Sequence, residues 1–218
     1  MIVIHYTGMR TGEEALARLT DPQARVSAHY LIEEDGRIFA LVPEERRAWH
    51  AGVAAWAGLH DINARSIGIE LVNPGHEFGY RPFPDRQIAA LIALIRDIRR
   101  RWPVPDSRIL GHSDVAPLRK QDPGELFPWD RLAAAGIGLW PAKGKWRTHG
   151  RVAPLSALAA FGYGWLAEED AQATAAVVRA FQRHFRPEQI NGHWDEECGR
   201  RLAWLLAAKE QEEWGEPT

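Results

Sequence analysis

The hydrophobic pattern of the first 141 residues predicts strands that alternate with helices. Residues 2–7 and 66–73 are short apolar runs rich in β-branched side chains, which is typical of buried strands. Residues 27–42 predict a hairpin that turns at Glu34-Asp35-Gly36. A further short strand is expected at Ile109-Leu110. These strands are the elements of the expected central sheet.

Two stretches with helical spacing separate these strands. Residues 11–21 predict a short helix with Thr11 as its N-cap and two glutamates in its first turn. Residues 84–102 predict a longer helix whose apolar face is formed by Ile88, Leu91, Ile92, Ile95 and Ile98. Alternating strands and helices favour an α/β fold in which helices cover a mixed sheet.

The pattern changes after Pro141. Residues 142–151 are basic and polar and predict a linker, whereas 155–164, 167–187 and 195–211 have helical patterns. We expect an apolar stripe on the middle helix to pack against leucines of the other two; the stripe is Val177, Val178, Phe181 and Phe185, and the leucines are Leu155, Leu158, Leu202, Leu205 and Leu206. The expected organisation is therefore a catalytic domain (1–141), a linker (142–151), a three-helix domain (152–208) and a tail (209–218).

Composition narrows the possible partners and compartments. A formal charge of −2 and a pI near 6.5 argue against a nucleic-acid partner, which usually requires a basic face. The single cysteine, Cys198, excludes an internal disulfide. The sequence contains no apolar run long enough for a membrane span and no signal peptide, so we expect a cytoplasmic monomer as the chain is written. The alternative is the periplasm or envelope if residues precede Met1.

The stretch GHSDVAPLRKQDPG, residues 111–124, concentrates polar chemistry in a segment unsuited to a regular helix or strand. Two prolines interrupt it, and it carries His112, Asp114, Lys120 and Asp122. A loop bent by Pro117 can bring His112 and Asp122 to one ion, whereas an extended strand would separate them at about 3.3 Å per residue. Asp114 is interpreted as a turn residue or a residue that supports the site from behind.

Two residues outside this loop complete a candidate catalytic set. His5 interrupts an apolar strand, and Glu70 is the one charged residue of another. Each has an ordinary interpretation when taken alone, since His5 can be a hydrogen-bonded core histidine and Glu70 a residue at a wet strand edge. Asp122 can likewise be a turn former and Lys120 a solvated lysine.

Taken together, these residues suit zinc chemistry. A catalytic zinc takes three protein ligands, keeps a fourth position for water or substrate, and lowers the pKa of that water toward about 7. Two histidines and an aspartate supply the ligands, Glu70 can accept the proton of the water, and Lys120 can stabilise an oxyanion. The sequence has no nucleophile elbow, P-loop or dinucleotide fingerprint.

Six separated motifs, in order, resemble a known family: VIHYTG, SAHYLIEEDGRI, RAWHAG, SIGIELVN, GHSDVAP and RKQDPGELFPW. They are similar to the zinc-dependent N-acetylmuramoyl-L-alanine amidases of the AmpD/AmiD type, relatives of the peptidoglycan recognition proteins. The resemblance covers residues 2–141. It implies a mixed sheet flanked by helices, with zinc in a groove on one side.

By motif position, the resemblance implies a role for each candidate residue. It implies that zinc is bound by His5, His112 and Asp122, and that Glu70 and Lys120 are catalytic. The wider superfamily often has cysteine as the third ligand, so an aspartate there points to the AmpD/AmiD branch. The resemblance also suggests His50 and Arg65 as substrate-binding residues, and His29 as a residue that orders the scaffold.

The C-terminal helices resemble, over a shorter stretch, the small peptidoglycan-binding domains of wall enzymes. The stretch is AFQRHFRP followed by INGHWDEECGRRLAWLL. The alternative is a helical extension that only covers a face of the catalytic domain.

The implied activity is zinc-dependent hydrolysis of the amide between N-acetylmuramic acid, including its 1,6-anhydro form, and the L-alanine of the stem peptide, in cell-wall recycling. The expected partners are peptidoglycan fragments or polymer. One alternative is a recognition module that binds muropeptides without cleaving them, which the complete candidate set disfavours. A glycosidase would need a second catalytic acid beside Glu70, and each suitable one is better used as a ligand.

Overall fold

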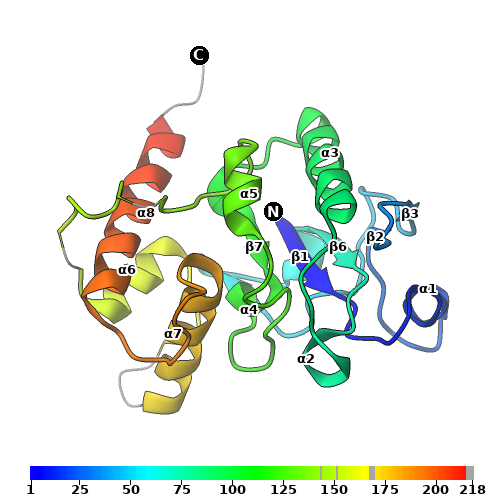
Figure 1. Ribbon diagram of the computed structural model, residues 1–218, viewed down its shortest axis with the longest axis horizontal. Helices are drawn as coiled ribbons and strands as arrows, with labels where there is room; N and C mark the ends of the chain where they lie inside the picture. The colour runs from blue at the N-terminus through cyan, green and yellow to red at the C-terminus, as the bar shows by residue number, and fades with distance from the viewer. Residues whose placement is uncertain (143, 151, 167–169, 215–218) are drawn as a thin grey trace.

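The structure, a computed structural model, describes residues 1–142, 144–150, 152–166 and 170–214 (Figure 1). Its centre is a five-stranded sheet with the order β3-β2-β6-β1-β7. The strands are β1 (Ile2–Tyr6), β2 (Tyr30–Ile32), β3 (Ile38–Ala40), β6 (Ile67–Leu71) and β7 (Ile109–Gly111). Neighbouring strands are parallel except for the antiparallel hairpin of β2 and β3. The predicted mixed sheet is confirmed.

Helices and short elements surround this sheet. The helices are α1 (Gly12–Thr20), α2 (Gly75–Phe78), α3 (Asp85–Arg101), α4 (His112–Val115), α5 (Trp129–Ala134), α6 (Pro154–Phe161), α7 (Ala171–Phe185) and α8 (Glu196–Trp214). A two-stranded ribbon, β4 (Ala55–Trp56) and β5 (Leu59–His60), and the 3-10 turns η1 (Ile62–Ala64) and η2 (Asp106–Arg108) complete the fold. Thr11 caps α1 as expected, with its hydroxyl accepting from the Glu14 amide at 3.2 Å.

Alternation along the strands sorts their side chains onto two faces. Ile2 and Ile4 of β1 contribute to a core shared with β6, α3 and α5. Val3, between them, contributes to a second core on the opposite face. His5 follows this alternation and therefore points to the same face as Val3, away from α3. The candidate site thus lies on the face that α3 leaves uncovered.

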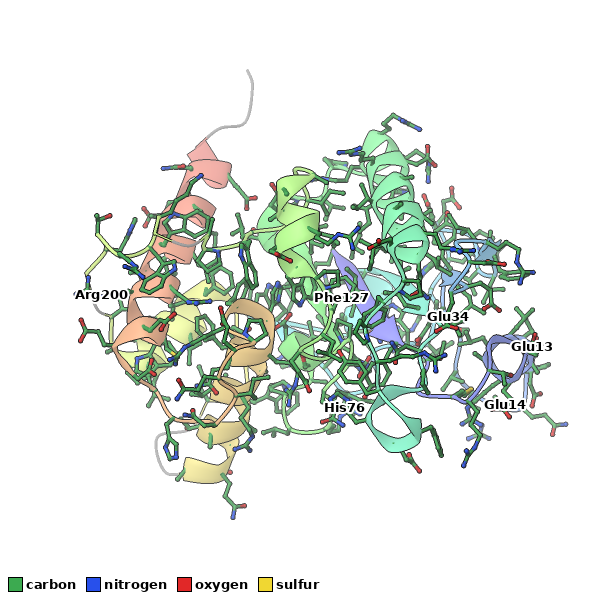
Figure 2. The ribbon with its side chains drawn as sticks, viewed as in Figure 1. Glu13, Glu14, Glu34, His76, Phe127 and Arg200 are labelled. Atoms are coloured by element: carbon green, nitrogen blue, oxygen red, sulfur yellow. The ribbon has the colours of Figure 1, made fainter. Side chains whose placement is uncertain are left out.

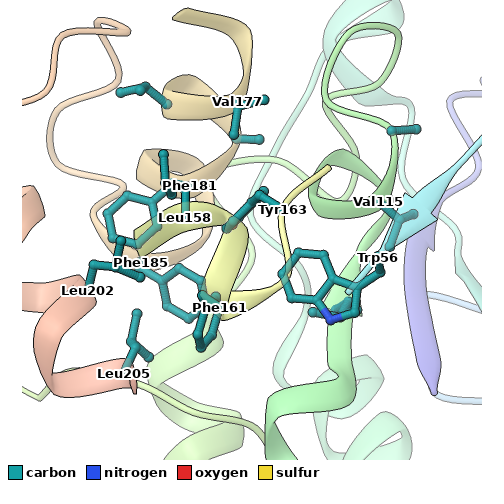
Figure 3. Packing of buried hydrophobic residues seen from close by; sticks show 14 of the residues in the cluster. Trp56, Val115, Leu158, Phe161, Tyr163, Val177, Phe181, Phe185, Leu202 and Leu205 are labelled. Atoms are coloured by element: carbon teal, nitrogen blue, oxygen red, sulfur yellow. The ribbon is translucent and has the colours of Figure 1, made fainter. Parts of the chain in front are cut away.

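The C-terminal helices pack onto the first unit through this second core. Trp56 and Val115 of the first unit lie close to Phe161 and Tyr163 and to the apolar stripe of α7 (Figure 3). The Trp56 ring centroid lies 4.9 Å from that of Tyr163 and 5.8 Å from that of Phe161. The expected packing of α6, α7 and α8 around the stripe is observed, except that Leu155 is outside the cluster.

Two sequence predictions about local structure are wrong. The last helical pattern was expected to end at 211 within a tail that begins at 209, but α8 continues to Trp214, where Lys209 donates to the Ala160 and Phe161 carbonyls and Glu212 accepts from the Ser107 amide. The segment 111–124 was expected to lack regular structure, but Gly111 ends β7 and the next four residues form α4. Residues 143, 151 and 215–218 of the predicted linker and tail lie outside the described residues. In the described part of the chain, no helix has the length and apolarity that a membrane span requires.

Glu44 provides a test of the electrostatics of the fold. Its carboxylate accepts from Arg101 Nε at 2.9 Å, from the Tyr30 hydroxyl at 2.6 Å and from Trp102 Nε1 at 2.7 Å. The bond with Arg101 is the main cause that lowers the Glu44 pKa to about 2, and burial opposes it. Because this pKa lies below the ordinary value, the contact stabilises the fold above pH 4.5 and the stabilisation is lost as the pH falls toward 2.

We therefore expect Glu44→Gln to lower the free energy of unfolding at pH 7 by about 1–2 kcal/mol, a figure kept small because Arg101 is partly exposed. The difference from wild type should shrink as the pH falls to about 3, as measured by urea unfolding. Glu45→Gln, at an exposed neighbouring position, should change stability by less than about 0.5 kcal/mol. A Glu44→Gln deficit that is equal at both pH values would contradict this account.

Candidate active site

Three adjacent strands bring Glu70, His5 and His112 into one row. Glu70 of β6 lies directly opposite His5 of β1 in the parallel register. Gly111 of β7 lies opposite Ile4, so the next residue, His112, follows at the level of His5. Because the carboxyl ends of parallel strands meet at one edge of a sheet, residues from three distant segments converge there. Figure 1 shows α2 and α4 at the end toward which the β1 arrow points.

The loop after α4 returns Asp122 to this row. The Asp122 carbonyl accepts from the Ser113 amide at 2.9 Å, which closes the loop beside His112. Gly124, two residues on, has a φ of +86°, and a side chain there would meet the Tyr80 hydroxyl at 2.3 Å. The DPG sequence therefore permits a tight return that another residue at the glycine position would obstruct.

The predicted ligand atoms meet at one point. His5 Nδ1 lies 2.9 Å from His112 Nδ1 and 3.1 Å from Asp122 Oδ2, and His112 Nδ1 lies 3.0 Å from the same oxygen. All three side chains are buried. Ligand atoms of a tetrahedral zinc site are about 3.3 Å apart, so a small expansion would admit the ion.

His112 is held in the tautomer that a metal ligand requires. Its Nε2 lies 3.0 Å from the Ala51 carbonyl, which can only accept a hydrogen bond. Nε2 therefore carries the hydrogen, and Nδ1 presents a lone pair to the cluster. The Arg119 guanidinium donates to the same carbonyl at 3.1 Å and fixes its position.

A chain of hydrogen bonds imposes the same state on His5. The Ser66 hydroxyl donates to the Ile62 carbonyl at 2.6 Å, so its oxygen accepts from His50 Nε2, 3.3 Å away. His50 Nδ1 is then free to accept from His5 Nε2 at 3.0 Å. The Ile62 carbonyl, which ends this series of hydrogen bonds, thus fixes the hydrogen of the His5 ring on Nε2. His5 Nδ1 is left unprotonated for a metal.

His50, suggested by the sequence motifs as a substrate-binding residue, lies behind His5 in this series of hydrogen bonds. His50 borders the cleft, but it is buried, and both of its ring nitrogens are engaged by His5 and Ser66. Its ring lies against Gly68 of β6, where a side chain would approach within 2.4 Å of it. These contacts predict that His50 positions His5 rather than contacting substrate directly.

The electrostatics of the cluster favour a cation. Burial, followed by the proximity of His112, lowers the pKa of His5 to about 4. Burial would raise the pKa of Asp122, but His112 and His5 outweigh it and hold that pKa well below its ordinary value. At neutral pH the site therefore presents the Asp122 carboxylate beside the neutral imidazole of His5, and oxygen and imidazole nitrogen are donors suited to a divalent metal such as zinc.

Glu70 differs from the ligands because its carboxylate is not fully paired. Its Oε2 is buried and has no hydrogen-bond partner among the described residues. Burial, and then the charge of Asp122, raises the Glu70 pKa well above its ordinary value, and Lys120 partly opposes this. A carboxylate in this state is suited to accept a proton near neutral pH.

The cluster opens into a cleft of about 490 Å³. Glu70, His5, His112, Asp122 and the exposed Lys120 all border it, so the structure brings the predicted catalytic set together. Arg65 is not among the cleft residues. It borders a separate hollow, and its Nε donates to the His60 carbonyl at 3.2 Å. The structure therefore does not bring Arg65 to the site.

Several other residues that the sequence motifs do not indicate also border the cleft. His76 belongs to α2 and is labelled in Figure 2. Its Nδ1 lies 2.9 Å from the Tyr6 hydroxyl, and its Nε2 lies 3.2 Å from Glu125. Trp49 is 54% exposed at the rim. Tyr6 and Trp49 adjoin His5 and His50 in sequence, and this proximity is a signal that could have identified them. His76 has no comparable signal in its surroundings.

Comparison with known proteins assigns the fold and site to a family. Residues 1–125 match the family described as N-acetylmuramoyl-L-alanine amidase. The amidase AmiD of Escherichia coli K12 is 41% identical over 220 residues, which cover 90% of this chain and 78% of that protein. The chain belongs to the N-acetylmuramoyl-L-alanine amidase family. The resemblance seen in the sequence motifs is thereby confirmed.

Solved structures of the amidase family extend this similarity to the C-terminal helices. The complex of E. coli AmiD with the substrate anhydro-N-acetylmuramic acid-L-Ala-D-γ-Glu-L-Lys superposes with a TM-score of 0.85 and 38% identity, covering 100% of this chain and 90% of that one. Pseudomonas aeruginosa AmpDH3 in complex with an anhydromuramic pentapeptide gives a TM-score of 0.87 and 36% identity, covering 96% and 91%.

In this amidase, the role of His50 can be measured as metal affinity. We expect His50→Ala to weaken zinc binding about 10- to 100-fold, because the partner that fixes the His5 tautomer is lost. Competition with a chromogenic chelator would measure the affinity. His60→Ala, which removes an exposed histidine of β5, is the matched control and should leave it unchanged. Equal affinities for the two variants would show that His50 does not position His5.

Proposed function

We propose that this amidase is zinc-dependent and hydrolyses the amide between N-acetylmuramic acid, including its 1,6-anhydro form, and the L-alanine of the stem peptide. The observation that carries the proposal is the convergence of His5, His112 and Asp122 at one point beside the unpaired Glu70 carboxylate. The two solved relatives bound to anhydromuramic peptides support the choice of substrate.

The protein residues have separate tasks in this reaction. His5, His112 and Asp122 would hold the zinc, which when bound polarises the amide carbonyl and activates water. Glu70 accepts the proton of the attacking water and returns it to the departing nitrogen, so the L-alanine leaves as an amine. The Lys120 ammonium, exposed in the cleft, stabilises the negative charge that develops on the carbonyl oxygen.

The test uses the purified chain with a soluble anhydro-muropeptide and, in parallel, with intact sacculi. We expect release of a peptide with a free L-alanine amine, loss of this activity on chelation, and its return when zinc is added. Binding of muropeptide without cleavage in the presence of zinc would instead support a recognition module. Preference between the two substrates would show whether fragments or polymer are used.

A further inference from the structure

The helix that begins with His112 also contains a buried carboxylate outside the metal cluster. Asp114 of α4 is fully buried and accepts three hydrogen bonds of 2.7 Å. The donors are the Gly111 amide, the Tyr163 hydroxyl and His184 Nδ1. Gly111 belongs to the sheet, whereas Tyr163 and His184 belong to the C-terminal helical unit. Both carboxylate oxygens are therefore held from across the boundary between the units.

The two C-terminal donors are themselves held firmly. The His184 ring is stacked between Trp129, with centroids 3.7 Å apart, and Phe185, with centroids 3.8 Å apart. Its Nε2 is buried and has no hydrogen-bond partner among the described residues, so stacking and the Asp114 bond set its orientation. Tyr163 packs edge-on against Trp56 in the shared core (Figure 3).

One short segment connects this anchor to two metal ligands. His112 lies two residues before Asp114 on α4, and Ser113, between them, donates its amide to the Asp122 carbonyl at 2.9 Å. A displacement of α4 would therefore move His112 directly and Asp122 through Ser113. We propose that Tyr163 and His184 are positioning residues that hold α4 in place and so set the spacing of His112 and Asp122 for the metal.

This inference rests on the proposed zinc-dependent function, and it gives the C-terminal unit a role in the active site. A buried carboxylate that loses donors must find others or reach water, and α4 would have to shift for either. The apolar contacts of the interface are less directional and would tolerate such a shift. The C-terminal unit makes directional contacts with α4 through the two short hydrogen bonds to Asp114 and the longer one, of 3.4 Å, from Trp165 Nε1 to the Val115 carbonyl, and the two short bonds are those that fix the buried carboxylate.

The test measures zinc affinity in the full chain, together with the absorption spectrum of the cobalt-substituted protein and the thermal midpoint. Tyr163→Phe removes one hydroxyl, and His184→Phe keeps a stacking ring but removes the donor. We expect the double variant to bind zinc about 10-fold more weakly, with a changed cobalt spectrum. When His184→Asn replaces His184→Phe in this double variant, the asparagine amide can donate from the position of Nδ1 and should recover part of the zinc affinity.

Gln182→Ala is the matched control for loss of stability alone. Gln182 lies on the same helix and bonds Asn191, Gly192 and His193 within the C-terminal unit. It should lower the thermal midpoint without changing zinc affinity. Wild-type affinity and spectrum in the Tyr163/His184 double variant would overturn the inference while leaving the proposed function intact. Failure of the wild type itself to bind zinc would overturn both.

Discussion

Glu70→Gln is expected to abolish most amide hydrolysis while leaving zinc binding intact. The amide has nearly the shape of the carboxylate but cannot accept the proton of water, so turnover should fall about 10²- to 10⁴-fold. Zinc stoichiometry and affinity should stay near wild type because Glu70 is not a member of the ligand cluster. Rates with an anhydro-muropeptide and competition with a chelator would measure the two quantities separately.

The stability of the same variant gives an independent check. Burial raises the Glu70 pKa, so at neutral pH the ionised form costs the fold stability that a neutral amide does not. The metal-free Glu70→Gln protein should therefore have a thermal midpoint equal to or above that of wild type. Glu33→Gln is a suitable control, since burial also raises the Glu33 pKa but this residue lies outside the cleft. Turnover of Glu70→Gln within a few-fold of the Glu33→Gln rate would exclude Glu70 as the proton acceptor.

The sequence singled out His5 and Glu70 as candidate site residues because each is a polar position within an apolar strand. His5 and Glu70 are polar interruptions of apolar strands, and alternation puts such residues on one face once the strands are neighbours. The loop from 111 to 124 showed its function through residue types that no regular element would combine. The six motifs, taken in order, then carried the family resemblance that assigned a role to each of these residues.

The features that the sequence did not predict depend on contacts between distant segments. Nothing in the sequence around His50 indicates that it would contact His5. The contact follows from the Ser66 hydroxyl, which donates to the Ile62 carbonyl and so accepts from His50. Arg65 precedes the Glu70 strand, but its guanidinium turns away to the His60 carbonyl. The bonds from Tyr163 and His184 to Asp114 connect residues about 50 or more positions apart in the sequence. Hydrophobic periodicity within one element gives no information on such contacts.

Asp122 should determine whether the cluster holds a metal. The binding free energy of a protein zinc site is on the order of 10 kcal/mol, so removing one of three ligands with Asp122→Ala should weaken zinc binding roughly 10²- to 10⁴-fold. Amide hydrolysis at limiting zinc should fall with it. Asp122→Cys should retain part of the affinity because a thiolate is also a zinc ligand. Metal analysis after dialysis, followed by chelator competition, would rank the variants.

The control for this series is Asp130→Asn, at an exposed aspartate outside the cleft, which should bind the one equivalent of zinc that we expect of wild type. Asp122 Oδ2 also lies within 3.1 Å of Nδ1 of both histidines, so the Asp122→Ala change leaves these Nδ1 atoms facing each other without a carboxylate. In Asp122→Ala, that change removes the interaction that raises the His5 pKa, which should therefore fall further. Histidine NMR titration of the metal-free protein can detect this fall. If Asp122→Ala keeps wild-type zinc affinity, the ion is bound elsewhere and the ligand assignment fails.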